Sequence, residues 1–338
     1  MRKVRVEDAE GLTLCHDLTE MRSGFKGPAF RRGHVITKED IPRMLDIGKG
    51  HVFIWEDNAG EIHEEDAAKR LAAILKVHGT HEQGPSEGKI LLISDIQGML
   101  RVNTSLLREL NSIDDITVCT LPDHYPVSPG MRVASMRIVP LVTQESRIVR
   151  AEELCRGKRV LDLLPYKALT AGIIITGAEI YHGRITDMFE PVCREKLKAY
   201  PGKIAGVRIC DDDPEMLIEA AREMLTLGAD FLIFSGGMSV DPDDVTPSAI
   251  RELGCEIVSY GVPSQPGNMT LVAYLGDLPV LGVPGAAITM PVTVFDVLLP
   301  QIFTGLRITK DDLIRLGDGG LCQQCKTCHY PNCTFGKY

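Results

Sequence analysis

The feature that most limits how this chain can fold is a regular alternation of apolar strands and amphipathic helices over residues 169–305. One of these strands, the apolar run 231–234, ends abruptly at Ser235-Gly236-Gly237. Such alternation predicts a mostly parallel sheet with helices on both faces. In an open sheet of this kind, ligands bind beyond the carboxyl ends of the strands, so the loop after residue 234 is a candidate binding loop.

Five strands and four helices are expected in this region from the periodicity of apolar residues and from helix caps. The expected strands cover residues 172–176, 206–210, 231–234, 256–260 and 279–283, and the expected helices cover 187–200, 214–227, 246–253 and 286–303. Asp213 and Thr246 are expected to cap their helices, each followed by a proline at the first helical position. The fold class predicted for this region is a doubly wound α/β sheet.

The chain before this region divides into two smaller parts. Residues 1–80 mix short extended runs with two amphipathic helices and predict a small α+β segment. Residues 86–150 contain several short strands and turns and predict a small, mostly β module, and the turn-rich stretch 79–88 is expected to be a linker. The α/β domain is placed at 165–306, which leaves a Cys-rich tail at 307–338.

Composition narrows the class of protein. A chain of 338 residues is long enough for two or three domains. A net charge of -9 and an aromatic content of 5% argue against nucleic-acid binding, because that requires clustered basic side chains or aromatic stacking surfaces. No apolar segment follows the charged N-terminus, and the apolar region 278–303 is interrupted by prolines and Asp296, so neither a signal peptide nor a membrane span is expected. We expect a cytoplasmic protein.

Three glycine-bearing loops follow three of the expected strands. They are Thr176-Gly177-Ala178-Glu179, Ser235-Gly236-Gly237-Met238-Ser239 and Val283-Pro284-Gly285. Because parallel strands end at a common edge, these loops should converge there. Glycine lets the backbone approach a ligand closely, and two of the loops precede helices whose N-termini favour an anion. Each loop alone could be an ordinary βα turn, but three in one domain favour a site for a phosphorylated ligand.

An acidic loop follows the Gly-Gly turn and contains Asp241, Asp243 and Asp244. Acidic runs are usually solvated loops. Beside a phosphate-binding turn they could instead hold Mg²⁺, which prefers one or two carboxylates together with substrate phosphates. We favour the Mg²⁺ interpretation for Asp244 and leave both interpretations open for the other two.

The tail carries four of the ten cysteines within twelve residues, at Cys322, Cys325, Cys328 and Cys333, with His329 among them. In a reducing compartment such a cluster indicates metal binding rather than disulfides. Three cysteines spaced by two residues are similar to the compact triplets of iron–sulfur proteins, whereas structural zinc usually draws on two separated pairs. We expect an iron–sulfur cluster, with zinc as one alternative and a disordered thiol tail as the other.

These motifs together resemble a known family. The Thr176-Gly177-Ala178-Glu179 loop, the Ser235-Gly236-Gly237 turn, Pro266-Gly267 and Pro284-Gly285 are similar in order and spacing to the molybdopterin-binding domain of molybdenum cofactor biosynthesis proteins. The type is that of the gephyrin E-domain, or molybdopterin molybdotransferase, although the segment from Asp243 to Pro247 is more similar to the adenylyltransferase branch. As a whole, the chain resembles molybdopterin-binding proteins that carry a Cys-rich tail.

The resemblance implies a pocket for molybdopterin. Its lining would comprise Thr176, Gly177, Glu179, Ser235, Gly236, Gly237, Ser239, Pro266, Gly267, Pro284 and Gly285. Asp243 and Asp244 would be the catalytic candidates and would hold Mg²⁺. The implied partners are a phosphorylated pterin or its adenylate, molybdate and a molybdoenzyme, and the dimers and trimers of related domains imply a homo-oligomer.

Several charged positions of that family are replaced in this chain. The family's Thr-Gly-Asp-Glu loop has Ala178 in place of its aspartate, and the Lys-Pro-Gly-Lys-Pro segment is Gln265-Pro266-Gly267-Asn268-Met269, without either lysine. A molybdotransferase-like enzyme and a non-catalytic carrier or sensor that docks to a molybdoenzyme are therefore both open, with a nucleotide phosphohydrolase relative as a third option. The replaced charges favour binding over catalysis.

Overall fold

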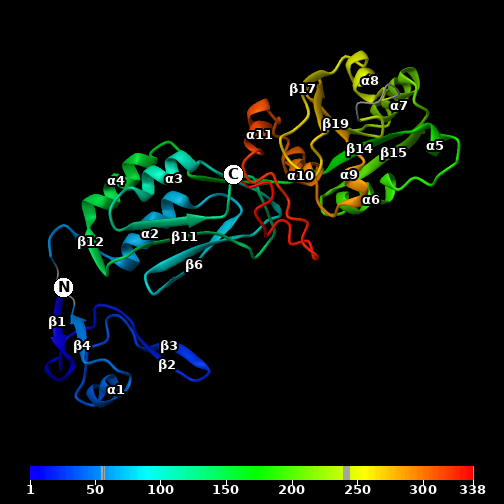
Figure 1. Ribbon diagram of the computed structural model, residues 1–338. Coiled ribbons are helices and arrows are strands. Elements are labelled where there is room, and N and C mark those ends of the chain that lie inside the picture. Colours follow the sequence, from blue (N-terminus) through cyan, green and yellow to red (C-terminus); the bar gives the residue numbers. More distant parts are fainter. Residues whose placement is uncertain (55, 57, 239–243, 338) are drawn as a thin grey trace. The chain divides into compact units, whose positions relative to one another are not determined.

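The structure is a computed structural model that describes residues 1–54, 56, 58–238 and 244–337 (Figure 1). The chain forms two compact units. Unit 1 comprises Met1–Asp95, Val102–Leu121 and Pro129–Asp162, and unit 2 comprises Ile96–Arg101, Pro122–Ser128 and Leu163–Tyr338. The division into domains at 1–80, 86–150, 165–306 and 307–338 stays a prediction.

Unit 2 is built on a six-stranded sheet with the order β15-β14-β16-β19-β18-β17. Its strands are β14 (Leu169–Thr176), β15 (Gly202–Cys210), β16 (Phe231–Ser235), β17 (Glu256–Tyr260), β18 (Leu271–Leu275) and β19 (Leu278–Val283). β14 is parallel to β15 and β16, and β16 is parallel to β19, whereas β18 is antiparallel to both of its neighbours. The expected mostly parallel α/β sheet is confirmed, and β18 is a strand that the sequence did not predict.

Strand β14 is buried on both of its faces. Ile173 and Ile175 belong to one core cluster with α6 (Phe189–Leu197) and α10 (Val294–Thr304). Ile174 belongs to a second cluster with α7 (Pro214–Thr226) and α8 (Thr246–Glu252). Helices therefore cover both faces of the sheet (Figure 1). This burial explains why β14 has a continuous apolar sequence rather than alternating apolar and polar residues.

The predicted helix starts and lengths in unit 2 are confirmed only in part. Asp213 caps α7 by accepting a 2.9 Å hydrogen bond from the Glu215 N–H. The single helix expected over 286–303 is wrong, because α9 (Ala286–Thr289) and α10 are separate helices. The reason is local: Thr293 and Asp296 form a capping box, and this reciprocal pair starts α10 afresh.

Unit 1 contains a four-stranded antiparallel sheet with the order β6-β7-β11-β9. Its strands are β6 (Thr80–Ser86), β7 (Lys89–Ser94), β9 (Ile116–Thr120) and β11 (Arg132–Ile138), and α2 (Glu64–Leu75) packs against β7 and β11. The linker expected at 79–88 is wrong, because residues 80–86 pair with β7 as a hairpin. Pairing with β7 provides hydrogen-bond partners for the backbone N–H and C=O groups of this polar segment. The turn-rich composition of the segment did not indicate a strand.

The N-terminal segment of unit 1 has a core of its own. It comprises β1 (Arg2–Arg5), η1 (Val6–Asp8), β2 (Leu18–Arg22), β3 (Phe25–Phe30), α1 (Asp40–Asp46) and β4 (His51–Ile54). β1 pairs with β4, and β2 forms a hairpin with β3. The core is small and apolar and includes Val6, Leu14, Ile36, Met44 and Val52.

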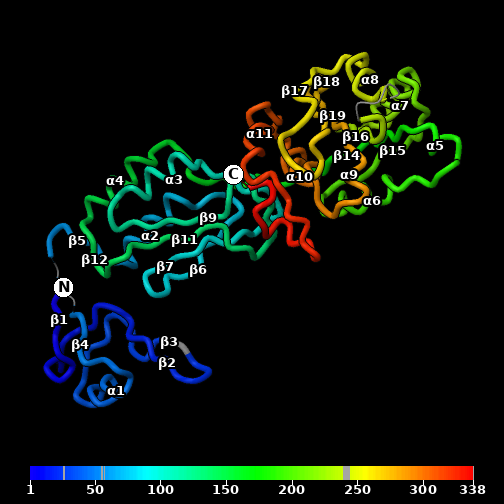
Figure 2. The backbone as a smooth tube through the Cα atoms, viewed as in Figure 1, coloured from blue at the N-terminus to red at the C-terminus, as the bar shows by residue number. Residues whose placement is uncertain are grey.

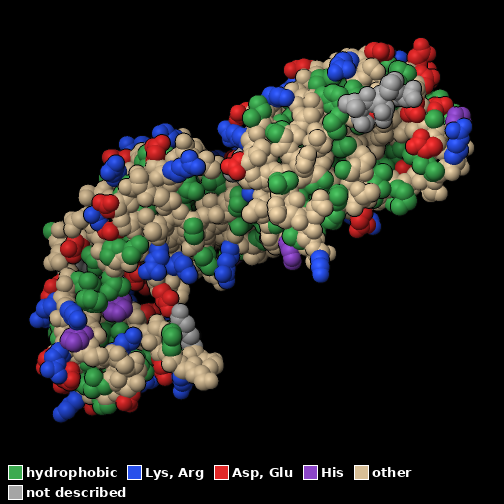
Figure 3. Space-filling view, viewed as in Figure 1, with side chains coloured by type: hydrophobic (Ala, Val, Ile, Leu, Met, Phe, Trp, Pro, Cys, Tyr) green, Lys and Arg blue, Asp and Glu red, His purple; other side chains and the backbone are tan. Residues whose placement is uncertain are grey.

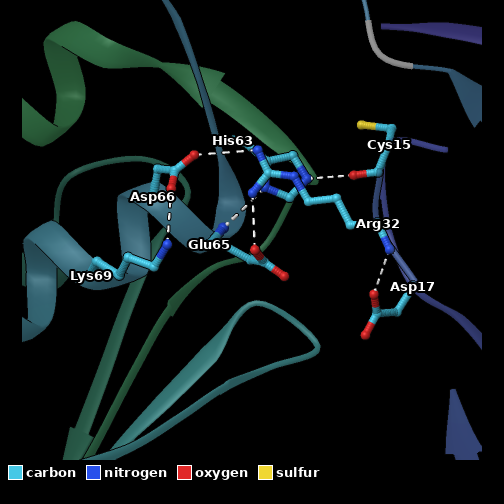
Figure 4. A network of polar contacts seen from close by, with 7 residues as sticks. All are labelled: Cys15, Asp17, Arg32, His63, Glu65, Asp66 and Lys69. Carbon is cyan, nitrogen blue, oxygen red and sulfur yellow. Dashed lines mark hydrogen bonds and ion pairs between the residues drawn. The ribbon is translucent and has the colours of Figure 1, made fainter. Parts of the chain in front are cut away.

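A polar network joins this N-terminal segment to α2 (Figure 4). The Arg32 guanidinium donates to the Glu65 carboxylate at 2.9 Å and to the Asp66 carboxylate at 3.3 Å. The buried His63 ring contacts the Cys15 carbonyl oxygen at 2.6 Å and accepts from the Glu65 N–H at 3.2 Å. Accepting from the Glu65 N–H requires a neutral ring, and burial favours this form because it lowers the pKa of His63.

The remaining elements complete the two units. They are β5 (Glu61–His63), which pairs with β12 (Val142–Gln144), β8 (Gly98–Val102), β10 (Tyr125–Val127), β13 (Leu161–Pro165), α3 (Thr104–Asn111), α4 (Glu145–Cys155), α5 (Ala178–Tyr181) and α11 (Lys310–Arg315). Within the described ranges, no helix combines the length and apolar character that crossing a membrane would require. Acidic and basic side chains are interspersed over the face drawn in Figure 3.

We expect the ion pair between α2 and α4 to stabilise unit 1 in a pH-dependent way. The Arg70 guanidinium donates two hydrogen bonds of 2.8 Å to Glu152, which lower the pKa of that carboxyl. A lowered carboxyl pKa contributes stability above the unfolded value, near 4.5, and loses it as pH falls through the folded value. Glu152→Gln should cost roughly 0.5–1 kcal/mol at pH 7 and much less at pH 3, as measured by urea unfolding.

The exposed neighbour on the same helix supplies the control for this experiment. Glu153→Gln removes a carboxylate from α4 without touching the Arg70 pair, so its effect should be small at both pH values. Equal losses for the two variants at pH 7 would contradict a specific contribution from the Arg70–Glu152 pair.

Candidate functional site

Three strand ends lie side by side at one edge of the unit 2 sheet. Ile175 of β14 is opposite Ser235 of β16, and Ser235 is opposite Val283 of β19. The loops that follow these strands therefore start at the same edge, as the sequence predicts. β15 lies on one side of β14 and β16 on the other, so the strand order reverses between β14 and β16. Such a switch point is where ligands bind in open α/β sheets.

The turn after β16 is packed tightly against the end of β14. Gly236 has a φ of +89° and Gly237 a φ of +53°. A Cβ atom at Gly236 would collide with the carbonyl oxygen of Thr176, so only glycine fits at this position. The hydroxyl of Thr246 donates to the Gly236 carbonyl at 2.9 Å. The prediction that Thr246 caps α8 is wrong, because its hydroxyl holds the Gly-Gly turn instead.

The loop after β14 is held by an aspartate that the sequence analysis did not select. Asp212 accepts a 3.0 Å hydrogen bond from the Thr176 hydroxyl and a 2.9 Å hydrogen bond from the Ala178 N–H. Thr176 is 3% exposed and also contacts the carbonyl of Asp211. Since the Ala178 N–H is engaged by a carboxylate, this loop offers an anionic ligand fewer donors than its sequence suggests.

A sequence signal for Asp212 was present. The run Asp211-Asp212-Asp213 follows the predicted strand 206–210, at the same sheet edge as the other candidate loops. We interpreted the run only as a helix cap, and Asp213 does cap α7. Asp212, one residue earlier, instead accepts hydrogen bonds from Thr176 at the end of β14 and from Ala178 in the loop that follows. The spacing of residues along the chain could not reveal this contact, because β14 is a separate strand.

The acidic loop lies mostly outside the described residues. Asp241, Asp243 and Ser239 belong to the range 239–243, of which the structure describes nothing, so their predicted roles stay predictions. Asp244 is partly buried, and burial of Tyr260, with the nearby charge of Asp244 as a smaller cause, raises the pKa of that phenol. The Tyr260 hydroxyl donates to the Met238 carbonyl at 3.0 Å, which ties β17 to the residue after the Gly-Gly turn.

The remaining predicted site residues have varied surroundings. Ser235 is buried at 3% exposure, whereas Glu179 is exposed. Pro284 and Gly285 follow β19, and their carbonyls accept from the N–H groups of Ala287 and Ile288 in α9. Pro266 and Gly267 contact the start of α10, where the Pro266 carbonyl accepts from the Val294 N–H at 3.1 Å. The structure thus groups Thr176, Gly177 and Ser235 to Gly237 and leaves Pro266 and Gly267 beside α10.

The tail brings its cysteines to one pocket. Cys322, Cys325, Cys328 and Cys333 all line a cavity of about 270 Å³, together with His329. All four are free thiols. Across the described part of the chain, no three His, Cys, Asp or Glu side chains are grouped closely enough to hold a metal ion. The predicted iron–sulfur cluster, and its zinc alternative, therefore stay predictions.

The fold is that of a doubly wound α/β domain, and the candidate loops lie at its topological switch point. Residues 172–304 of this domain match the family described as "Probable molybdopterin binding domain". Residues 3–56 match a domain of unknown function. The resemblance expected from the loops is confirmed over the α/β domain.

Two relatives illustrate the family match. The chain is similar to a protein named "Molybdopterin molybdenumtransferase" from Synechococcus elongatus, with 26% identity over 174 residues that cover 48% of this chain and 43% of that protein. It is also similar to a "CinA-like protein" from Mycobacterium tuberculosis, with 35% identity over 89 residues that cover 26% of this chain and 21% of that protein. The chain spans less than half the length of these curated relatives.

Solved structures resemble this chain only at low sequence identity and low TM-score. A molybdopterin biosynthesis MoeA protein from Pyrococcus horikoshii is 14% identical, with a TM-score of 0.33, over 90% of this chain and 75% of that one. The molybdopterin biosynthesis enzyme MoaB from Thermus thermophilus is 19% identical, with a TM-score of 0.31, over 40% of this chain and 89% of that one. The family assignment rests on the sequence match and not on these scores.

We expect Gly236→Ala to destabilise unit 2 more than a matched glycine substitution. Gly254 has a nearly equal φ of +93°, but a Cβ there would meet nothing within 4 Å. Both variants carry the backbone strain of a positive φ, about 1 kcal/mol, and only Gly236→Ala adds the collision with the Thr176 carbonyl. Urea unfolding should show a loss of roughly 2 kcal/mol or more for Gly236→Ala. Equal losses for the two variants would mean that the turn does not pack against β14 as described.

Proposed function

We propose that unit 2 binds a phosphorylated pterin, molybdopterin or its adenylate, at the carboxyl ends of β14 and β16, and that the protein acts in molybdenum cofactor biosynthesis or maturation. The observation that carries this proposal is the alignment of Ile175, Ser235 and Val283 at one sheet edge within residues 172–304. The family description supports the ligand, and the switch point between β14 and β16 supports the location.

The Gly-Gly turn is the best-supported part of the proposed site. The missing side chains at Gly236 and Gly237 let the turn pack against Thr176 and Thr246, and in this proposal the backbone of the turn binds the phosphate. The buried Ser235 hydroxyl lies directly before the turn. Asp212 would act by positioning, because it holds the Thr176 hydroxyl and the Ala178 N–H in fixed directions. In this proposal Asp244, with Asp243, holds the Mg²⁺ that neutralises the ligand phosphates.

A non-catalytic role competes with molybdate insertion. The aspartate of the related first loop is Ala178 here, and the segment from Gln265 to Met269 has neither lysine of the family pattern. Fewer charged groups mean weaker placement of molybdate, so a carrier or sensor that passes the cofactor to a molybdoenzyme is the second candidate. Multiple-turnover measurements distinguish the two proposals. An enzyme supplied with adenylated molybdopterin and molybdate would release AMP repeatedly. A carrier would bind the adenylate stoichiometrically.

The predicted homo-oligomer is also part of the proposal. Tyr181 ends α5, and Ile185 and Met188 lie in the segment between α5 and α6; the exposed fractions of these three side chains are 45%, 53% and 57%. Exposed apolar side chains that lie close together are common at subunit interfaces. Light scattering should give a mass above that of one chain, and Ile185→Glu should lower it. A monomeric wild-type protein would contradict this part of the proposal.

We expect calorimetry to detect binding of molybdopterin and to show a component that depends on Mg²⁺. Asp244→Asn removes one charged oxygen ligand and should weaken the Mg²⁺-dependent affinity by roughly tenfold, which corresponds to about 1.4 kcal/mol. The melting temperature should change little, since Asp244 is only partly buried and is not part of the core clusters.

The exposed carboxylate of Glu219 on α7 supplies a matched control. Glu219→Gln changes the net charge of unit 2 by the same amount and should leave the affinity unchanged. If neither molybdopterin nor its adenylate binds, with or without Mg²⁺, the proposed function is wrong. If binding occurs and Asp244→Asn behaves like Glu219→Gln, the pterin site stands but the Mg²⁺ assignment fails.

A further inference from the structure

The four tail cysteines lie on a loop whose start is fixed to the α/β domain. The Gln265 N–H donates to the Gly320 carbonyl at 2.8 Å, and the Cys322 N–H donates to the Gln265 carbonyl at 2.9 Å. The buried Ser264 hydroxyl adds a 3.0 Å hydrogen bond to Gly320. The residues just before the first cysteine therefore pair with the Gln265 segment much as a short parallel strand would.

The end of the same loop is fixed as well. Phe335 is 2% exposed, and the Gly336 N–H donates to the Gly319 carbonyl at 3.0 Å. Within the loop, the Tyr330 hydroxyl donates to the Asp296 carbonyl of α10 at 3.3 Å. The tail thus folds back on itself and is anchored on both sides of the cysteines (Figure 2). A loop closed at its base keeps its thiols near one another at little further entropic cost.

The tail thiols differ from the other cysteines of unit 2 in their surroundings. Cys193 and Cys210 are 0% and 2% exposed, and burial raises the pKa of both thiols, to about 12 and about 11. Such cysteines behave as small apolar core residues. Cys325, Cys328 and Cys333 are exposed and face a shared pocket instead. No packing requirement accounts for thiols at these three positions, which points to a role in ligation.

We infer that Cys322, Cys325, Cys328 and Cys333 ligate an iron–sulfur cluster in this pocket. The cysteines are spaced by two, two and four residues, and compact runs of this kind bind iron–sulfur clusters through four thiolates. Structural zinc usually takes its ligands from two separated pairs, which this tail lacks. Iron and sulfide are supplied from outside the protein, and each thiol releases its proton as its sulfur binds iron.

The present arrangement of the loop is compatible with this assignment. The four thiols line one pocket, and among the described residues no three of them are grouped closely enough to hold a metal ion. Residues 323–329 are exposed and lie between the two anchored ends, so their side chains can turn inward without disturbing the core. Metal sites commonly reach their final geometry only when the metal binds.

The pocket also locates the cluster relative to the proposed pterin site. Pro266 and Met290 line the same cavity as the four cysteines. Pro266 and Gly267 belong to the loop that the resemblance assigns to the pterin, so the proposed cluster lies against that loop. Cluster loading would fix the tail onto the Gln265 segment and is expected to raise the melting temperature. The cluster itself does not depend on the proposed function, since its ligands belong to the tail.

The test is anaerobic purification of the full chain, followed by iron, acid-labile sulfide and zinc analysis and by absorption and electron paramagnetic resonance spectra. We expect about two or about four iron atoms per chain with matching sulfide, and absorption near 400 nm that reductant bleaches. Cys325→Ser and Cys328→Ser should each lose most of the iron, while the far-ultraviolet circular dichroism remains that of a folded protein.

Cys119→Ser is the matched control, because Cys119 is an exposed free thiol in β9 of unit 1. It should leave the iron and sulfide contents unchanged. Stoichiometric zinc without iron would overturn the assignment, as would protein that contains neither metal after reconstitution with iron and sulfide. A disulfide among the four cysteines in the anaerobic protein, detected by mass spectrometry, would also overturn it. Loss of pterin binding with the cluster intact would refute the proposed function alone.

Discussion

The candidate site depends on the parallel pairing of β14 with β16. Because both strands are buried between helices on each face, their register is fixed by packing, and a one-residue slip would move Ile173, Ile174 and Ile175 to the wrong sides. That register puts the end of β14 against the Gly-Gly turn. The missing side chain at Gly236 and the Thr246 hydroxyl then hold the turn against Thr176.

A second constraint ties the tail to the same domain. The segment at Gln265 pairs with Gly320 and Cys322 on one side and contacts the start of α10 through Pro266 on the other. The cysteine loop is therefore hydrogen-bonded directly to a loop of the expected pterin site. Because the tail is hydrogen-bonded to the Gln265 segment, a conformational change in the tail would act on the α/β domain first at Gln265.

Much of the fold could be predicted from the sequence. The continuous apolar runs of β14 and β16 indicated a parallel sheet buried on both faces, and Asp213-Pro214 indicated the start of α7. The site could be predicted only as three loops at one edge. Asp212 was missed because its role depends on the neighbouring strand, and β6 was missed because the polar segment 80–86 shows no strand pattern without its partner β7.

The sequence by itself determined most strands of the α/β domain and which loops carry glycine, because periodicity and backbone freedom depend on neighbouring residues. It also determined the cysteine spacing, and with it the chemistry proposed for the tail. Only the tertiary structure decided that Asp212 reaches Thr176, that Thr246 holds a turn instead of capping a helix, and that the tail lies beside Pro266. The physical reason is that each of these contacts joins residues distant in the chain, and strand order and register, not sequence spacing, bring them together.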